Sequence, residues 1–210
     1  MPLLRTLGAA GIGYGLGMIP SADLAAKAAS GGTVDLRSAG SGNPGAANAV
    51  KVLGPAWGYG VMAADILKAT AACGAGRGLA GSRGAHVAGV ASVVGHCFPA
   101  NNGFRGGKGV ACSVGQCLAT FPAYFPIDLG VAALTSTRRW KSRSYAATAV
   151  ASATWVLGSL LWWKRGWRNA WGPSPDGDLV VAAAASSALI LYKFATARPP
   201  AAGPDTGASA

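Results

Sequence analysis

Long apolar stretches alternate with short polar segments along almost the whole chain. The apolar stretches are 1–29, 55–76, 85–98, 110–137, 145–163 and 179–194. The stretch 145–163 has no charged residue and is about long enough to cross a bilayer as a helix. The stretch 110–137 is too long for one crossing and contains Pro122 and Pro126, so it predicts two short helices that meet at the prolines. The pattern predicts an all-α integral membrane protein with about seven short transmembrane helices.

The chain ends and the charges between the apolar stretches predict a domain boundary and an orientation. Residues 1–197 are expected to form a single transmembrane helical domain, and 198–210, with Pro, Gly and Ser, a disordered tail. Basic residues gather on the cytoplasmic side of membrane proteins, and the densest basic cluster here is 138–143. This pattern predicts an N-terminus outside the cell, a cytoplasmic C-terminus, and polar loops at the cytoplasmic face of the inner (plasma) membrane.

Composition agrees with a chain that lies mostly in lipid. Only 12% of its 210 residues are charged and 51% are hydrophobic, whereas a soluble domain has about 25% charged residues. Its 32 glycines favour helices that approach one another closely in lipid. The net charge of +11 favours anionic partners, namely membrane lipids and phosphorylated metabolites. No nucleic-acid partner is expected, since no basic segment is long and polar enough to follow a duplex.

The first polar loop, 30–48, is rich in glycine, serine and asparagine. Glycines let backbone N–H groups turn inward around an anion, and a following helix adds its positive N-terminal end. Ser41 and Asn43 carry hydrogen-bond donors, and Lys51 lies about two turns into that helix. The loop therefore predicts a phosphate site, although the same residues also make ordinary turns.

The second polar loop, 101–109, is the stronger candidate. It ends in Arg105, Gly106, Gly107, Lys108 and Gly109, directly before an apolar helix. Two cations, three glycines and a helix N-terminus suit a phosphate group. The loop is not a Walker A motif, because Gly109 replaces the hydroxyl residue that binds magnesium, so nucleotide hydrolysis is not expected. A plain cytoplasmic turn with positive charges is the alternative.

Few other residues are candidates for catalysis, ligand binding or metal binding. His96 lies beside the second loop and can act as a base, as a hydrogen-bond donor or as a structural histidine. Asp65 and Lys68 lie three residues apart within an apolar stretch, so they either pair with each other or contact a ligand. With two histidines and no CxxC spacing among four cysteines, no metal and no cofactor is predicted.

The two loops together resemble the bacterial acyl-phosphate:glycerol-3-phosphate acyltransferase family. The resemblance covers roughly residues 19–113. It is carried by the segments 40–48, 95–99 and 104–111 and by the Asp65-Ile66-Leu67-Lys68 sequence. The family is described as a multi-helix membrane enzyme that needs no coenzyme A and is not known to need a metal. It moves an acyl chain from acyl-phosphate to glycerol 3-phosphate, giving lysophosphatidic acid and phosphate.

The resemblance also implies roles for individual residues. Ser41 and Lys51 would hold the acceptor, and the second loop would hold phosphate and stabilise developing charge. The expected catalytic residues are Ser41, His96 and Lys108. The expected substrate-binding residues are Gly42, Asn43, Lys51, Arg105, Gly106, Gly107 and Gly109.

The chain departs from the family pattern on the acceptor side. A His-Arg-Glu-Asn cluster that usually follows the last helix is missing from 192–197, and Lys51 stands where arginine is usual. Two other functions therefore stay open: a divergent or inactive member with another acceptor, and a small transporter of a phosphorylated solute. A transporter needs a polar path through the membrane, for which the sequence offers only Asp65 and Lys68.

Overall fold

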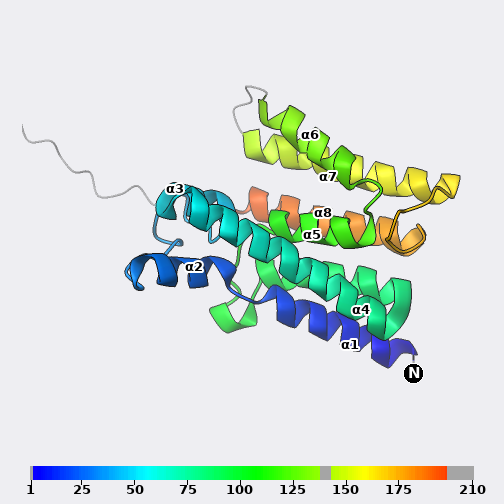
Figure 1. Ribbon diagram of the computed structural model, residues 1–210, viewed down its shortest axis with the longest axis horizontal. Helices are drawn as coiled ribbons and strands as arrows, with labels where there is room; N and C mark the ends of the chain where they lie inside the picture. The colour runs from blue at the N-terminus through cyan, green and yellow to red at the C-terminus, as the bar shows by residue number, and fades with distance from the viewer. Residues whose placement is uncertain (1, 138–142, 198–210) are drawn as a thin grey trace, which may run out of the picture.

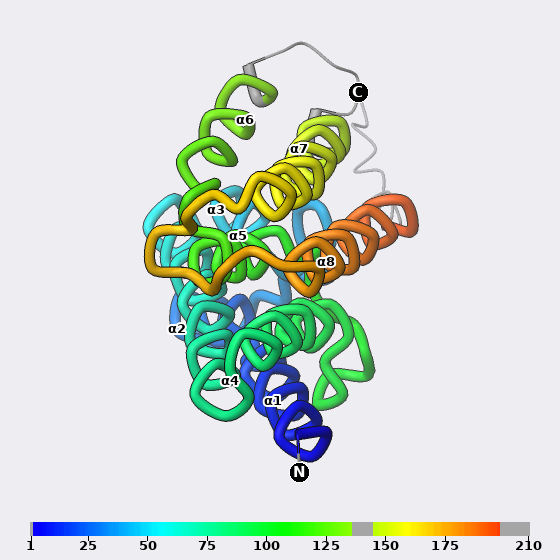
Figure 2. Tube along the Cα trace, turned by 90° about the vertical axis from the view of Figure 1, so that its right-hand side faces the viewer, coloured from blue at the N-terminus to red at the C-terminus, as the bar shows by residue number. Residues whose placement is uncertain are grey.

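The chain is helical, with no strand, over the residues that the computed structural model describes, 2–137 and 143–197. The elements are α1 (Pro2–Gly17), α2 (Ser21–Ser30), α3 (Ala46–Leu53), α4 (Pro55–Cys97), the 3₁₀ helix η1 (Ala100–Asn102), α5 (Val110–Thr120), α6 (Phe125–Thr137), α7 (Arg143–Arg165) and α8 (Gly177–Ala195). The long helices run side by side along the long axis of the molecule, and the short α2 and α3 lie together at one end (Figure 1). Seen along the helices, the bundle is stacked from α1 through α4, α5 and α8 to α6 and α7 (Figure 2). The all-α prediction is confirmed for the described residues.

α4 doubles back on itself at a kink. Ala80 and Gly81 have non-helical backbone angles, and the φ of +64° at Gly81 is one that glycine adopts without steric cost. The two halves then touch backbone to backbone, since a Cβ on Gly76 would collide with the carbonyl oxygen of Gly84. The halves, 55–79 and 82–97, correspond to two separate apolar stretches of the sequence.

α1 packs closely along the returning half of α4. A Cβ on Gly13 would collide with the backbone of Ala88, and one on Gly17 with that of Ser92. Such close contact between glycine faces suits helices in lipid, where backbone packing replaces the hydrophobic effect as the force between helices.

The first apolar stretch, 1–29, is not the single helix that the sequence predicts. α1 ends at Gly17 and α2 begins at Ser21. Pro20 has no backbone N–H to continue the α1 ladder, so the chain turns there. The break directs α2 across the end of the bundle and brings Asp23 towards the two polar loops.

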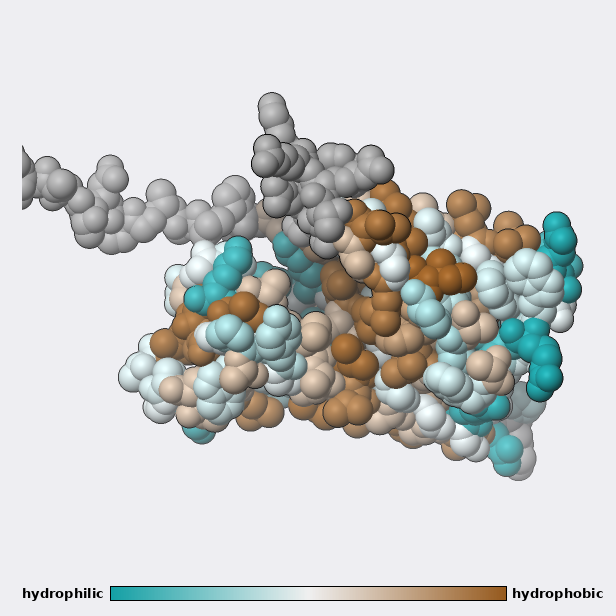
Figure 3. Space-filling model, turned by 45° about the horizontal axis from the view of Figure 1, so that its top comes forward, coloured by the Kyte–Doolittle hydropathy of each residue, from teal (hydrophilic) through white to brown (hydrophobic). Residues whose placement is uncertain are grey.

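The surface has the apolar belt of a membrane protein. Hydrophobic side chains gather over the middle of the molecule and hydrophilic ones towards its two ends (Figure 3). Large apolar side chains are widely exposed, including Leu134 at 71% and Val181 at 68%. By length and apolar character, two described helices could cross a membrane, Tyr145–Arg165 and Gly177–Ala195. α5 and α6 have 11 and 13 residues, which is shorter than the roughly 30 Å apolar core of a bilayer.

Two sequence predictions fall outside the described residues. The predicted disordered tail, 198–210, is one of them, and most of the basic cluster, 138–142, is the other. Both remain predictions, as does the extent of the single domain.

Candidate anion-binding site

One buried amide side chain shapes the first loop. Asn48, at the start of α3, is 1% exposed. Its Nδ2 donates to the carbonyl oxygens of Leu36 and Ala39, each at 2.9 Å. Its Oδ1 accepts from the backbone N–H of Ser41 at 2.7 Å. The loop is therefore organised by its own chain before any ligand binds.

Arg37 connects the first loop to α2 and to the second loop. Its Nη1 and Nη2 donate to the two carboxylate oxygens of Asp23 at 2.6 and 3.1 Å. Nε and Nη2 also donate to the carbonyl oxygen of Arg105 at 3.3 Å. The hydrogen bond to Asp23 raises the pKa of Arg37, so this guanidinium stays charged. It links α2, the first loop and the second loop.

The second loop folds back onto the end of α4. The N–H of Gly106 donates to the carbonyl oxygen of Cys97 at 3.2 Å, and that of Gly107 to the carbonyl oxygen of His96 at 3.1 Å. A Cβ on either glycine would collide with His96, and one on Gly107 would also lie 3.1 Å from the carbonyl oxygen of Pro44. The two loops therefore meet at Gly107, in a space that only glycine fits.

Lys108 and the start of α5 form the cationic part of this loop. Gly109 caps α5 with a φ of +87°, and the first N–H groups of a helix have no helical partner. The Nζ of Lys108 lies 4.1 Å from the centre of the Phe194 ring, and burial lowers the pKa of this lysine. An anion at the start of α5 would meet both an ammonium group and the positive end of the helix.

α8 brings a second lysine to the same loop. The Nζ of Lys193 donates to the carbonyl oxygens of Cys97 and Gly106 at 3.0 and 3.3 Å and lies 4.7 Å from the centre of the Phe98 ring. Lys193 belongs to the segment from which the family's last motif is missing. In place of the missing cluster, this segment therefore supplies a cation that contacts the backbone of the second loop at Gly106.

A buried ion pair lies beneath the loops. The Nζ of Lys68 is 2.8 Å from Oδ1 of Asp65 and 3.1 Å from Nδ1 of His96. Both members of the pair are buried, so the pairing is confirmed. Because Asp65 also lines the pocket described below, a ligand contact stays a prediction. Ligand atoms of Asp65, His96 and Cys112 lie within 4.8 Å of one another, as in a metal site. The ammonium of Lys68 already supplies a cation to two of these ligands, so the residues do not fit a metal ion well.

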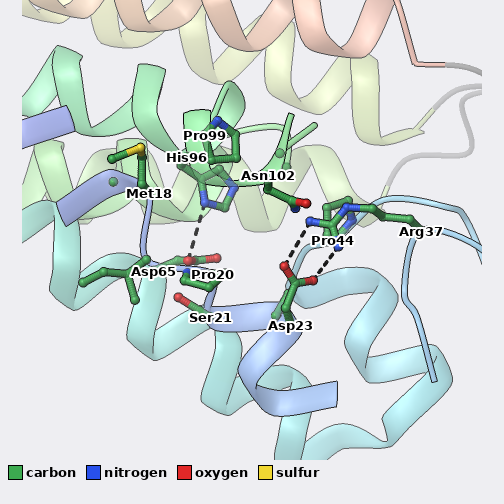
Figure 4. Close-up of a pocket in the computed structure, with 15 residues that line it drawn as sticks. Met18, Pro20, Ser21, Asp23, Arg37, Pro44, Asp65, His96, Pro99 and Asn102 are labelled. Carbon is green, nitrogen blue, oxygen red and sulfur yellow. Dashed lines mark hydrogen bonds and ion pairs between the residues drawn. The ribbon is translucent and has the colours of Figure 1, made fainter. Parts of the chain in front are cut away.

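A small pocket opens between the two loops and the α1–α2 break (Figure 4). It holds about 300 Å³ of space, including solvent at its mouth. Its polar lining includes Ser21, Asp23, Arg37, Asp65, His96 and Asn102. His96 and Asp65 face each other on one side, while the Arg37–Asp23 pair lies on the other (Figure 4).

The pocket brings only some of the predicted site residues together. His96, Gly106 and Gly107 line it. The predicted residues outside its lining are Ser41, Gly42, Asn43, Lys51, Arg105, Lys108 and Gly109. Lys51 is exposed on α3 and makes no hydrogen bond or ion pair within the described part of the chain. The ligand roles of all these residues stay predictions.

Sequence reasoning missed three contributors to the site. Arg37 and Asp23 pair at one side of the pocket. The hydroxyl of Tyr14 donates to the carbonyl oxygen of Phe98 and accepts from the N–H of Ala100. Arg37 could have been noticed as a cation at the edge of a glycine-rich loop. Asp23 and Tyr14 carry no local signal, because only packing brings them to the loops.

These features define a class of protein: an all-helical membrane protein with two glycine-rich loops and several cations at one end of the bundle. The family model described as glycerol-3-phosphate acyltransferase matches residues 7–198. The chain belongs to this glycerol-3-phosphate acyltransferase family.

Individual proteins with the same description are similar to this chain. A glycerol-3-phosphate acyltransferase of Thermoanaerobacter sp. (strain X514) is 38% identical over 132 residues, 62% of this chain and 65% of that protein. The chain thus spans slightly less than two thirds of that relative's length. Glycerol-3-phosphate acyltransferase 1 of Rhizobium johnstonii is 37% identical over 156 residues, 73% of this chain and 75% of that protein.

The fold is also similar to a solved structure. This is the crystal structure of PlsY (YgiH), an integral membrane glycerol 3-phosphate acyltransferase, in its glycerol 3-phosphate form. The TM-score is 0.70 at 29% identity, covering 94% of this chain and 96% of that one. The lysophosphatidic acid form of the same protein gives a TM-score of 0.69 at 27% identity, covering 92% and 93%.

Proposed function

We propose that this protein is a membrane acyltransferase that moves a fatty acyl group from acyl-phosphate to glycerol 3-phosphate. The products are lysophosphatidic acid and phosphate, which places the reaction in phospholipid biosynthesis. The observation that carries the proposal is the meeting of two glycine-rich loops at Gly107, with Lys108 at the start of α5 beside them. Both substrates carry phosphate, which is the group that such loops bind.

An apolar groove supports acyl-phosphate as the donor. It runs along α1, the returning half of α4 and α8, and its lining includes Tyr14, Val87, Val94 and Val181. Tyr14 connects the groove to the site, because its hydroxyl holds the start of the second loop. An alkyl chain in this groove would lie at the depth of the lipid tails while its phosphate lies near the loops.

The reaction needs positioning and charge stabilisation. The acceptor hydroxyl attacks the acyl carbonyl carbon and the bond to the phosphate oxygen breaks. Phosphate leaves with that electron pair and takes up the hydroxyl proton. Negative charge grows on the carbonyl and leaving oxygens, where Lys108 and the start of α5 act. Ser41, Gly42, Asn43 and Lys51 hold the acceptor close to the donor, which reduces the entropic cost of the encounter.

The proposed topology has seven crossings, counting α4 as two, with the N-terminus outside and the loops in the cytoplasm. Ser38→Cys and Asn101→Cys probe the loop end, and Arg168→Cys probes the opposite end, since all three positions are exposed. The four native cysteines are buried and should give little background. An impermeant thiol reagent added to intact cells should label only Arg168→Cys. Labelling of Ser38→Cys or Asn101→Cys from outside would reverse the orientation.

The decisive experiment is a reconstituted assay. Purified protein in lipid is given palmitoyl-phosphate and labelled glycerol 3-phosphate, and labelled lysophosphatidic acid is measured. Formation of the product with release of phosphate supports the proposal. Binding of palmitoyl-phosphate without transfer to glycerol 3-phosphate would instead favour another acceptor or an inactive member. Movement of labelled glycerol 3-phosphate across vesicles without chemistry would favour a transporter.

A further inference from the structure

The ammonium of Lys68 lies against one ring nitrogen of His96. The Nζ of Lys68 lies 3.1 Å from Nδ1 of His96, and it also donates to the carbonyl oxygen of Ile19 at 2.8 Å. A lysine ammonium has three donors and no acceptor. In a contact between them, Nδ1 must therefore be the acceptor, and a neutral imidazole then carries its proton on Nε2.

The local charges also favour a neutral imidazole. Asp65 and Lys68 are 2% and 6% exposed and form an ion pair of zero net charge. A second ring proton, placed on Nδ1 of an imidazole that already carries one on Nε2, would create an imidazolium with its charge 3.1 Å from the ammonium. Buried charges without a counterion are strongly unfavourable. The Nδ1–Oδ1 separation between His96 and Asp65 is 3.5 Å, too long for a strong competing hydrogen bond.

The ring edge that carries Nε2, opposite Nδ1, points to the place where the two loops meet. A Cβ on Gly107 would collide with Nε2 of His96, so this nitrogen lies directly against the second loop. We propose that Lys68 is a positioning residue that holds His96 as the Nε2–H tautomer, so that His96 presents a hydrogen-bond donor, and not a base, to a phosphate oxygen beside Gly107. The inference deepens the proposed function and relies on it for the identity of the phosphate.

Nitrogen NMR tests the tautomer without any activity measurement. The full chain, labelled with ¹⁵N at lysine and histidine and placed in lipid nanodiscs, has only two histidines to assign. In the unmodified protein, the ring signals of His96 are recognised because its Nδ1 lies close to a lysine Nζ. The expected spectrum shows a protonated Nε2 and a bare Nδ1. A proton on Nδ1, alone or in an imidazolium, would overturn the proposal.

Removal of the ammonium should move the proton. In Lys68→Met the nearest partner of Nδ1 becomes Oδ1 of Asp65, and we expect a protonated Nδ1. Lys68→Arg keeps a cationic donor and should keep the Nε2–H tautomer. It is the variant to measure if Lys68→Met does not fold. Lys27→Met, at an exposed lysine of α2, is the control and should change nothing. An unchanged spectrum in Lys68→Met contradicts the positioning role.

The donor role has two further readouts. Inorganic phosphate added to the labelled protein should shift the Nε2 resonance of His96, and a resonance that stays in place at saturating phosphate would refute the contact. His96→Gln keeps an N–H donor but has no basic nitrogen, so kcat should fall by less than about tenfold. A fall of about a hundredfold to ten-thousandfold, typical of a lost general base, would overturn the donor role. If the unmodified protein transfers no acyl group, the proposed function fails while the tautomer result still stands.

Discussion

The two glycine-rich loops meet at Gly107 but are held in different ways. The first loop is organised by a side chain, because the buried amide of Asn48 binds three backbone groups of that loop. The second is organised mainly through its backbone, by the N–H groups of Gly106 and Gly107 against the end of α4 and by Lys193 on its carbonyl oxygens.

The cations of the two loops differ in whether they already have a partner. Arg37 of the first loop is already engaged with Asp23 and with the carbonyl oxygen of Arg105. Lys108 of the second loop makes no ion pair within the described residues, and its ammonium lies over the ring of Phe194. A cation without a counterion near a helix N-terminus is available to a ligand anion, whereas a paired guanidinium mainly supports structure. The second loop, called the binding loop below, therefore offers an unpaired cation to an anion. The first, called the structural loop below, has its arginine engaged in the fold, and its proposed acceptor contacts are Ser41, Asn43 and Lys51.

The largest expected effect is on the binding loop. Lys108→Ala should lower activity on the order of a hundredfold, about 3 kcal/mol, because a preorganised charge near the leaving phosphate is lost. The fold should survive, since the side chain is only partly buried and α5 remains. The measurement is lysophosphatidic acid formation, with Lys27→Ala as the matched control. Equal turnover in both variants would remove Lys108 from the site.

A smaller effect is expected from the structural loop. Asn48→Ala should lower the free energy of unfolding by about 2 kcal/mol, because buried carbonyl and N–H groups lose their partner. Thermal unfolding in lipid should show this loss, together with faster proteolysis of the segment 36–41. A variant of unchanged stability would show that the backbone alone holds the first loop.

Lys193 tests whether α8 supports the binding loop. Lys193→Met keeps an apolar stem above Phe98 but loses the hydrogen bonds to Cys97 and Gly106. The expected result is a rise in the apparent KM for phosphate-bearing substrates of about tenfold, from the lost charge-assisted hydrogen bond to Gly106 of the loop. Steady-state kinetics with each substrate varied in turn would detect it. No change in either KM would mean that the second loop holds its shape without α8.

The smallest effect is expected at Lys51, where the resemblance implies an acceptor contact and the structure shows an exposed side chain. Lys51→Arg supplies a planar fork that binds phosphate through two hydrogen bonds. We expect a few-fold lower KM for glycerol 3-phosphate and no change in thermal stability. An unchanged KM in both Lys51→Arg and Lys51→Ala would place the acceptor elsewhere.

The sequence alone predicts the all-helical class, the family and the two anion-binding loops. These conclusions rest on local signals: apolar stretches of membrane length, and glycines next to cations before a helix. The family prediction and the all-helical prediction are confirmed by the residues matched, 7–198, and by the helices observed. The erosion of the last motif is equally local, since its residues are absent from 192–197.

Only the tertiary structure shows which residues, distant in the sequence, contact one another around the two loops. Asp23 reaches Arg37 only because the chain breaks at Pro20, and Lys193 reaches the second loop only because α8 packs beside α4. The contact between Lys68 and His96 spans 28 positions and two halves of one folded helix. Sequence patterns report each residue's own environment, whereas the proton on His96 depends on a neighbour that only packing supplies.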